Sequence, residues 1–325
     1  MEMDWLGAGI GGPLVVIRAI HFSATAILAG SLIFRAVVAK PALRSEPAIA
    51  KLFRTQIRTQ TLGVAWIGLS ITTASGVIWF LLQAVAMSGR PFGEAMTSDV
   101  LLTVLNQTQF GLVSEIRFAL AIILAACLAY DRLAQADWFA LVAALGLTAA
   151  IAWNGHAGAT PGAMGNVHVT VDVLHLIAAA AWIGGLVSLA LLLVAARNIR
   201  TAVWVPLARN AAERFSTLGI ISVTTLMVTG IVNAWILVGS FHALVMSGYG
   251  RLLMLKIAIF AIMLVFAAAN RFWLTPRLGF SSANEAQFEA LRQLTRNSVI
   301  EIALGITIFA IVGMLGTLHP TIHGL

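Results

Sequence analysis

The sequence predicts an all-α membrane protein, a polytopic bundle of about eight transmembrane helices. Hydrophobic residues make up 60% of the 325 residues and charged residues only 10%, whereas a soluble domain carries about 25% charged residues. The mean hydropathy is +0.94. Apolar runs of about 20 residues, each long enough to cross a hydrocarbon core of about 30 Å, recur along the whole chain. Helices are expected because every backbone polar group in lipid must be satisfied within its own segment.

The connections between the predicted helices alternate in charge. In chain order the eight apolar runs occupy residues 13–36, 62–88, 111–130, 138–154, 166–195, 215–239, 250–272 and 297–318. Of the 20 Lys and Arg residues, 15 lie in or beside the first, third, fifth and seventh connections, and only Arg90 and Arg251 lie in the others. Positive charge marks cytoplasmic connections. Both termini are therefore expected outside the cytoplasm, facing the periplasm in a bacterium.

Several classes of protein are excluded by the same composition. The net charge of +7 is concentrated in alternate connections, which indicates a membrane-lipid environment and no nucleic-acid partner. The N-terminal MEMDWL is acidic where a signal peptide is basic, so no cleavage is expected. The single cysteine, Cys127, excludes an intrachain disulfide and a multi-thiolate metal site. No Ser-His-Asp triad, P-loop or HExxH motif is present, and we expect no enzymatic activity.

The chain contains a weak internal echo at an offset of 154 residues. The segment His21–Gly30 aligns with His175–Gly184, and Ser75-Gly-Val-Ile78 aligns with Thr229-Gly-Ile-Val232. No polar linker divides the chain, so we expect one transmembrane domain over residues 1–325. The echo is the pattern of two parallel four-helix halves, 13–154 and 166–318, although apolar helices also match by chance.

Ionisable side chains within the predicted helices are candidate functional residues, because each is costly in lipid unless it is paired or hydrated. Counting from the helix ends places all but one of them in the outer half of the membrane. The exception is Glu301, which is expected to pair with Arg296 or Arg271. The set comprises Arg18, His21, Glu115, Arg117, His168, Asp172, His175, Lys256 and Glu301.

Three of these residues share one helix face. His168 and His175 are seven residues apart, close to two full helical turns, and Asp172 lies between them. With His21 at a similar depth, the pattern predicts that His21, His168 and His175 converge on one metal ion, although His21 alone is also typical of a core histidine. Asp172 is expected either to orient a ligating imidazole or to neutralise Arg18.

The remaining candidates have weaker roles. Glu115 is expected to form a structural charge network with Arg117, Arg18 or Lys256. His156 and Met164 lie in the Gly-rich connection 154–167 and are further candidate ligands. Imidazole with thioether and without thiolate suits copper, and imidazole alone also suits haem iron or zinc.

Several segments resemble the copper resistance protein D family (CopD/PcoD) of bacterial inner-membrane proteins. The strongest resemblance lies in the C-terminal half, and the helices of His21 and His175 resemble the N-terminal part. The segments are Glu213-Arg-Phe-Ser216, Val228–Ala234, Tyr249–Lys256, Asn270–Leu278 and His175–Leu186.

The resemblance implies copper handling in the bacterial inner membrane, as copper transport, homeostasis or resistance. It implies His21, His168 and His175 as copper ligands, with His156 and Met164 as an entry site. It further implies a soluble periplasmic partner, a copper carrier of the CopC type, on a separate chain.

Two alternatives stay open at this point. A b-type cytochrome would hold one haem b between His21 and His175 as axial ligands. Copper storage, sensing or delivery at the outer face is also compatible with the sequence, because the inner half offers an ion few polar residues beyond Glu301 and Asn270.

Overall fold

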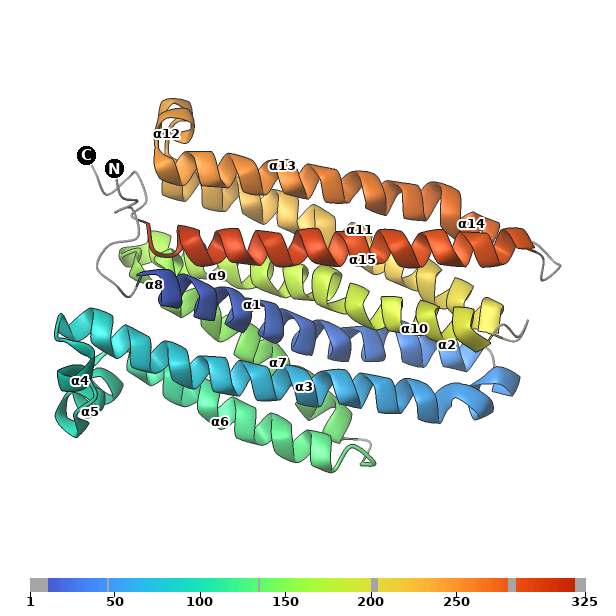
Figure 1. Ribbon diagram of the computed structural model, residues 1–325, viewed down its shortest axis with the longest axis horizontal. Coiled ribbons are helices and arrows are strands. Elements are labelled where there is room, and N and C mark those ends of the chain that lie inside the picture. The colour runs from blue at the N-terminus through green and yellow to red at the C-terminus, as the bar shows by residue number, and fades with distance from the viewer. Residues whose placement is uncertain (1–10, 46, 134, 200–203, 280–284, 319–325) are drawn as a thin grey trace.

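The structure is a computed structural model that describes residues 11–45, 47–133, 135–199, 204–279 and 285–318. Within these residues it is a bundle of long helices with no strand, and eight helical segments are long and apolar enough to cross a membrane. The predicted all-α membrane bundle is therefore confirmed. The helices run roughly alongside one another down the long axis of the molecule (Figure 1).

The first four spans fill the N-terminal half of the chain. The first comprises α1 (Gly11–Ile33), a π-helical segment η2 (Phe34–Ala39) and α2 (Lys40–Ser45). The second is α3 (Pro47–Ser88), and the third is α6 (Gln109–Ala129). The fourth joins α7 (Ala136–Ala149) to η3 (Ala150–Asn154). Two short helices, α4 (Phe92–Ala95) and α5 (Ser98–Gln107), lie between α3 and α6.

The last four spans follow the short helix α8 (His156–Ala159). The fifth comprises α9 (Gly162–Ala179), the π-helical segment η4 (Ala180–Gly184) and α10 (Gly185–Ile199). The sixth is α11 (Trp204–Val238), followed by the short α12 (Phe241–Met246). The seventh joins α13 (Gly248–Ala269), the π-helical segment η5 (Asn270–Leu274) and α14 (Thr275–Arg277), and the eighth is α15 (Glu285–Leu315).

Several helices extend beyond their predicted limits at one end only. The sequence predicts helices from residues 62, 215 and 297, whereas α3, α11 and α15 begin at Pro47, Trp204 and Glu285. A hydropathy pattern detects only the part of a helix that lies in lipid. The charged turns continue the helix because its backbone hydrogen bonds are internal and persist in water.

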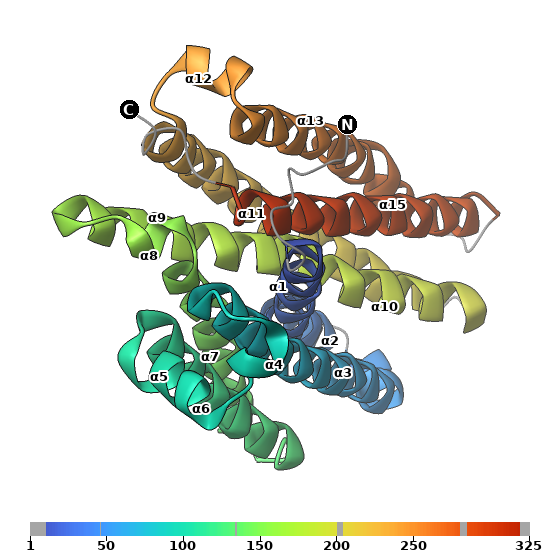
Figure 2. The ribbon, with the colours of Figure 1, turned by 60° about the vertical axis from the view of Figure 1, so that its left-hand side comes forward.

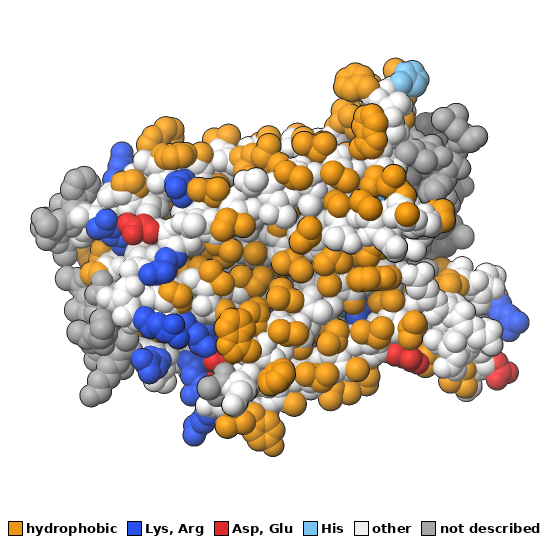
Figure 3. All heavy atoms as spheres, turned by 180° about the vertical axis from the view of Figure 1, so that it is seen from behind, with side chains coloured by type: hydrophobic (Ala, Val, Ile, Leu, Met, Phe, Trp, Pro, Cys, Tyr) orange, Lys and Arg blue, Asp and Glu red, His pale blue; other side chains and the backbone are white. Residues whose placement is uncertain are grey.

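The two ends of the bundle differ in charge. We call the end with α4, α5, α8 and α12 the histidine end, and the end with α2, α14 and residues 130–133 the basic end. Lys and Arg gather at the basic end, and a hydrophobic band separates the two ends (Figure 3). At the basic end Arg58 bonds both oxygens of Asp131, and Arg35 bridges to Asp137 at 2.8 Å.

The first and fifth spans form the centre of the bundle. In an oblique view α1 lies between α3 on one side and α10 and α15 on the other (Figure 2). A Cβ on Gly30 would overlap the carbonyl oxygen of Ala180, and a Cβ on Gly184 would overlap that of Ala26. Small residues therefore allow the α1 and η4 backbones to touch. The two contacts are reciprocal, because Ala26 and Ala180, like Gly30 and Gly184, are 154 residues apart.

Candidate functional site

His21 lies on α1, buried against α3 and α6. Its Nδ1 is 2.9 Å from the hydroxyl oxygen of Ser75, and that hydroxyl donates its proton to the carbonyl of Ile71 at 2.6 Å. The Ser75 oxygen therefore accepts the Nδ1–H proton, which leaves the lone pair on Nε2. Arg117 of α6 donates to this Nε2. Both ring nitrogens of His21 are thus hydrogen-bonded within the protein.

Two buried guanidinium groups lie over Trp79, whose ring centroid is 5.4 Å from that of His21. Arg18 donates to the carbonyl oxygen of Gly316 at 2.8 Å. Its guanidinium carbon lies 5.4 Å from the ring centroid of Trp79, and that of Arg117 lies 5.2 Å from the same ring. Neither arginine takes part in an ion pair among the described residues. This first site is therefore positively charged and is stabilised by cation–π contacts.

His175 lies on α9 and has a comparable first partner. Its Nδ1 is 2.9 Å from the hydroxyl oxygen of Thr229 on α11, and that hydroxyl donates to the carbonyl of Thr225 at 2.6 Å. The same reasoning places the His175 proton on Nδ1 and the lone pair on Nε2. Among the described residues, no hydrogen bond engages His175 Nε2. This imidazole therefore presents a lone pair that is available to a ligand.

We call the surroundings of His175 the second site. Asp172 lies one turn before His175 and gives this site a negative charge that the first site, around His21, lacks. Its carboxylate accepts a hydrogen bond from Asn233 Nδ2 at 3.2 Å. The ammonium group of Lys256 on α13 interacts electrostatically with Asp172 and with His175. The second site therefore holds one carboxylate and one ammonium group beside the imidazole.

The two sites are built from equivalent positions of the chain. Each histidine bonds a hydroxyl 54 residues later. Each also lies beside a glycine, Gly76 or Gly230, whose added Cβ would approach the ring at 3.4 or 3.6 Å. Contacts at equal spacing in both halves are the expected result of two repeats with the same fold.

The cations of the two sites are equivalent as well. Arg117 lies nine residues after the helix cap Thr108, which accepts from the Gly111 amide at 3.0 Å. Lys256 lies nine residues after the cap Ser247, which accepts from the Gly250 amide at 2.9 Å. At the offset of 154 residues Arg18 corresponds to Asp172, and Trp79 corresponds to Asn233. The two sites share a histidine, a hydroxyl and a cation. They differ at the positions of Arg18 and Trp79 in the first site, which are Asp172 and Asn233 in the second.

The structure does not gather the predicted ligands in one cluster. His168 is buried and lies 2.8 Å from the Thr160 hydroxyl through Nδ1. His156 Nε2 lies 3.2 Å from the carbonyl oxygen of Leu315, and Met164 is 57% exposed. Among the described residues no three His, Cys, Asp or Glu side chains form a metal-binding group. His21 and His175 each turn toward the next span of their own half.

The predicted partners of two charged residues also differ. Asp172 bonds Asn233, and Arg18 bonds the Gly316 carbonyl, so these two residues form no ion pair with each other. Glu115 lies on an exposed face of α6 and joins no ion pair among the described residues. Helical periodicity shows which residues share a face but not which way that face turns.

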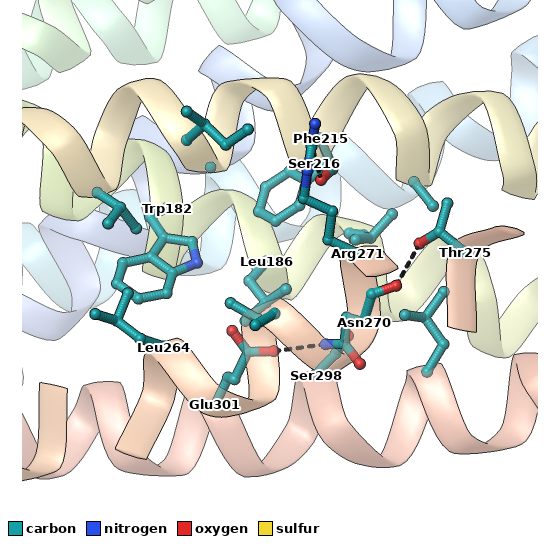
Figure 4. A pocket seen from close by; sticks show the side chains of 18 of the residues that line it. Trp182, Leu186, Phe215, Ser216, Leu264, Asn270, Arg271, Thr275, Ser298 and Glu301 are labelled. Carbon is teal, nitrogen blue, oxygen red and sulfur yellow. Dashed lines mark hydrogen bonds between the residues drawn. The ribbon is translucent and has the colours of Figure 1, made fainter. Parts of the chain in front are cut away.

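A second polar group lies toward the basic end, around a cavity of about 250 Å³ between α11, η5 and α15 (Figure 4). Glu301 lines this cavity and accepts a hydrogen bond from Asn270 Nδ2 at 2.7 Å. The expected pairing of Glu301 with Arg296 or Arg271 is not found among the described residues. Glu301 bonds Asn270 instead, and Arg271 donates to the Ser216 hydroxyl at 2.6 Å. The cavity was not predicted from the sequence.

Four partners of the two histidines were also missed by reasoning from sequence. The internal echo already aligns Ser75 with Thr229, and this alignment was the signal that could have revealed the hydroxyl partners. Arg117 and Lys256 were recognised as intramembrane cations but not as equivalent neighbours of the histidines. Their offset differs because the connection before α6 is longer than that before α13.

Comparisons with known proteins agree with this architecture. Residues 9–166 match the family model for the copper resistance protein D-like N-terminal domain, and residues 209–315 match that for copper resistance protein D. The chain is 30% identical to copper resistance protein D of Pseudomonas syringae pv. tomato, over 79% of this chain and 82% of that protein. It is 29% identical to the inner membrane protein YebZ of Escherichia coli K12, over 94% of this chain and 98% of that protein.

A third relative is the copper transport protein CutJ of Bacillus subtilis 168, 27% identical over 83% of this chain and 49% of that protein. The resemblance read from the sequence is therefore confirmed at both ends of the chain. The eight spans and the matches in both halves lead to one assignment: this chain is a multi-pass membrane protein that belongs to the copper resistance protein D family.

Proposed function

We propose that this protein binds copper as its cargo in the inner membrane, and that it does so through His175 in the second site. The observation that carries this proposal is the lone pair on His175 Nε2, on a helix that carries the carboxylate of Asp172 one turn earlier. A metal ion requires a neutral imidazole with an accessible lone pair. Thr229 holds the ring in the tautomer that provides it.

Charge selects the second site over the first. The positions of Arg18 and Asp172 are equivalent, and a copper ion is repelled by the guanidinium group and attracted by the carboxylate. In the first site, moreover, the lone pair of His21 Nε2 already accepts from Arg117. We therefore assign copper binding to the second site, at His175, and a structural role to the first site, at His21.

Residues nearer the histidine end support an entry route to His175. His168 lies two turns earlier on α9, and His156 and Met164 lie beyond it on α8 and at the start of α9. Imidazole and thioether groups are ligands that copper accepts. We infer that copper reaches His175 past these residues from the periplasm, delivered by a separate CopC-type carrier. The proposal involves binding and transfer only, without enzymatic chemistry.

The haem alternative has less support. A haem held by His21 and His175 would require the Nε2 lone pair of each ring. The Nε2 lone pair of His21 already accepts a hydrogen bond from Arg117. Each histidine is also held by a hydroxyl of its own half, and the named relatives are copper proteins or an inner membrane protein.

Matched histidine variants test the proposal. Wild type, His175→Ala and His21→Ala are purified in detergent, and bound copper is measured by mass spectrometry and by competition with a chelator, for Cu(I) under reductant and for Cu(II). We expect His175→Ala to lose the bound copper and His21→Ala to retain it. Loss of copper only in His21→Ala, or wild-type protein without copper, would overturn the assignment. A Soret band in the visible spectrum would favour the haem alternative.

A further inference from the structure

The cavity at the basic end contains a buried carboxylate for which copper binding at His175 gives no role. Its wall is mostly apolar, with Trp182 and Phe215 on one side and Glu301, Asn270 and Ser298 on the other (Figure 4). A Cβ on Gly219, which also lines the cavity, would meet no atom within 4 Å. The volume of about 250 Å³ has room for several water molecules at about 30 Å³ each.

One of the two carboxylate oxygens of Glu301, Oε2, is available to bind a proton or a ligand. Its side chain is buried, with 1% of its surface exposed. Oε1 accepts from Asn270 Nδ2 at 2.7 Å, and Asn270 Oδ1 in turn accepts from Asn297 Nδ2 at 2.9 Å. Among the described residues Oε2 has no hydrogen-bond partner. Neutral amides therefore fix the orientation of the carboxylate without neutralising its charge.

No cation pairs with Glu301 among the described residues. Arg271 is the one other charged side chain that lines the cavity, and it donates to Ser216. The helices packed against α15 carry their charges toward the ends of the bundle. The neighbouring helices carry Arg18 on α1, Arg197 on α10, Arg251 and Lys256 on α13, and Arg277 on α14. The other charged residues of α15 itself, none of them buried and all in its first twelve residues, are Glu285, Glu289, Arg292 and Arg296.

The backbone around the cavity is irregular at two places. Asn270 and Arg271 belong to the π-helical segment η5, and Trp182 belongs to the π-helical segment η4. Both segments contribute to the cavity wall. Single π-helical turns within α-helices are frequent at functional sites. Trp182 also follows His175 by seven residues on the same span, so the cavity lies about two helical turns inward from the proposed copper site.

The donor set of the cavity favours a proton over copper. Its lining offers one carboxylate, one amide, one guanidinium group and several hydroxyl groups, and it contains no imidazole, thiolate or thioether, which are the ligands that copper prefers. A hydrated divalent cation such as Mg²⁺ or Ca²⁺ is typically held by several oxygen ligands. An unpaired carboxylate within a membrane is most readily neutralised by a proton.

We propose that Glu301 is a proton-binding site that exchanges with water in this cavity and couples proton movement to copper movement. Protonation forms one O–H bond at Oε2, and deprotonation returns that proton to water. Asn270 keeps the carboxylate directed into the cavity in both states. The coupling rests on the proposed copper function, whereas proton binding by Glu301 does not.

Infrared spectroscopy tests proton binding without copper. The purified protein in lipid nanodiscs is titrated with acid, and the C=O stretch of a protonated carboxyl group is followed in difference spectra. Every carboxyl group of the chain contributes to these spectra, so the Glu301 component is the difference between variants: we expect it to be present in wild type, absent in Glu301→Gln, and retained in Glu115→Gln and in Asp172→Asn. Identical difference spectra for wild type and folded Glu301→Gln would overturn the proton site.

Proteoliposomes test the coupling. Copper is added to wild-type vesicles that contain a pH-sensitive dye, and we expect proton movement that Glu301→Gln abolishes and Glu115→Gln retains. Copper-dependent proton movement that persists in Glu301→Gln would overturn the coupling. Absence of copper binding in the His175 experiment would instead remove the copper function, and the infrared result would still decide whether Glu301 binds a proton.

Discussion

At the scale of single residues, one hydroxyl determines how each histidine can act. Ser75 and Thr229 both donate their own proton to a carbonyl one turn back on the same helix. Each oxygen is then free to accept from Nδ1 of its histidine, and Nε2 becomes the reactive nitrogen. The difference between the two sites comes from their charged groups, namely Arg117 and Arg18 in the first site and Lys256 and Asp172 in the second.

The variant Thr229→Val tests this role of the hydroxyl. It keeps the shape of the side chain and leaves the His175 Nδ1–H without an acceptor. Loss of such a supporting contact lowers metal affinity roughly 10–100-fold, and we expect a fall of that size in a chelator competition titration. The equivalent variant Ser75→Ala should leave copper affinity unchanged. Equal effects of both variants would contradict the division of roles between the copies.

The variant Asp172→Asn tests the carboxylate. Asparagine retains an oxygen that can accept from Asn233, so the fold should persist, while the negative charge beside His175 is lost. We expect copper affinity to fall roughly 10–100-fold with little change in melting temperature. Glu115→Gln, on an exposed face, serves as the control for removal of a carboxylate. Unchanged copper binding in Asp172→Asn would show that Asp172 does not assist the metal ion.

At the scale of helices, the contact of α1 with η4 sets the geometry of both sites. Gly30 and Gly184 bring the two backbones together without intervening side chains. Helices in lipid lack a hydrophobic driving force for association, so close packing at small residues contributes much of their stability. The rotation of α1 and α9 fixed at this crossing directs His21 toward α3 and His175 toward α11.

Substitution of Gly184 by leucine should disrupt this crossing. Its side chain would collide with the backbone of Ala26, and overpacking of this kind costs about 1–3 kcal/mol, sometimes more. We therefore expect a lower melting temperature of the purified protein in detergent. Gly63→Leu on α3 is the matched control, since a Cβ there would meet no atom within 4 Å. Similar melting temperatures for both variants would contradict the role of the crossing.

At the scale of the whole molecule, charge separates the two ends of the bundle. Lys and Arg cluster at the basic end (Figure 3), and α1 begins and α15 ends at the histidine end (Figure 1). Basic connections remain cytoplasmic during membrane insertion. The histidine end, with its candidate copper entry, is therefore expected to face the periplasm.

Reporter fusions test this orientation. Fusions after Arg132 and Arg200 should give cytoplasmic signals, and fusions after Ala159 and Leu325 should give periplasmic signals, because the positive-inside bias sets topology. The paired measurements are the activities of a reporter active only in the cytoplasm and of one active only in the periplasm. A cytoplasmic signal at both Ala159 and Leu325 would reverse the orientation and place Glu301, not His175, nearer the periplasm.

The sequence by itself determined the membrane environment, the eight helices and the family. Each of these depends on local properties, such as an apolar run of about 20 residues or a short motif, so no knowledge of neighbouring helices is needed. The same reasoning identified His21, His175, Asp172 and Glu301 as intramembrane polar residues.

Only the tertiary structure decided which groups those residues meet. It gave His21 and His175 different hydroxyl and cation neighbours, and it joined Glu301 to Asn270 beside a cavity. A periodic pattern defines the face of a helix, but the direction of that face depends on how the helix is rotated against its neighbours. That rotation is set by contacts such as Gly30 with Ala180, between residues far apart in the chain.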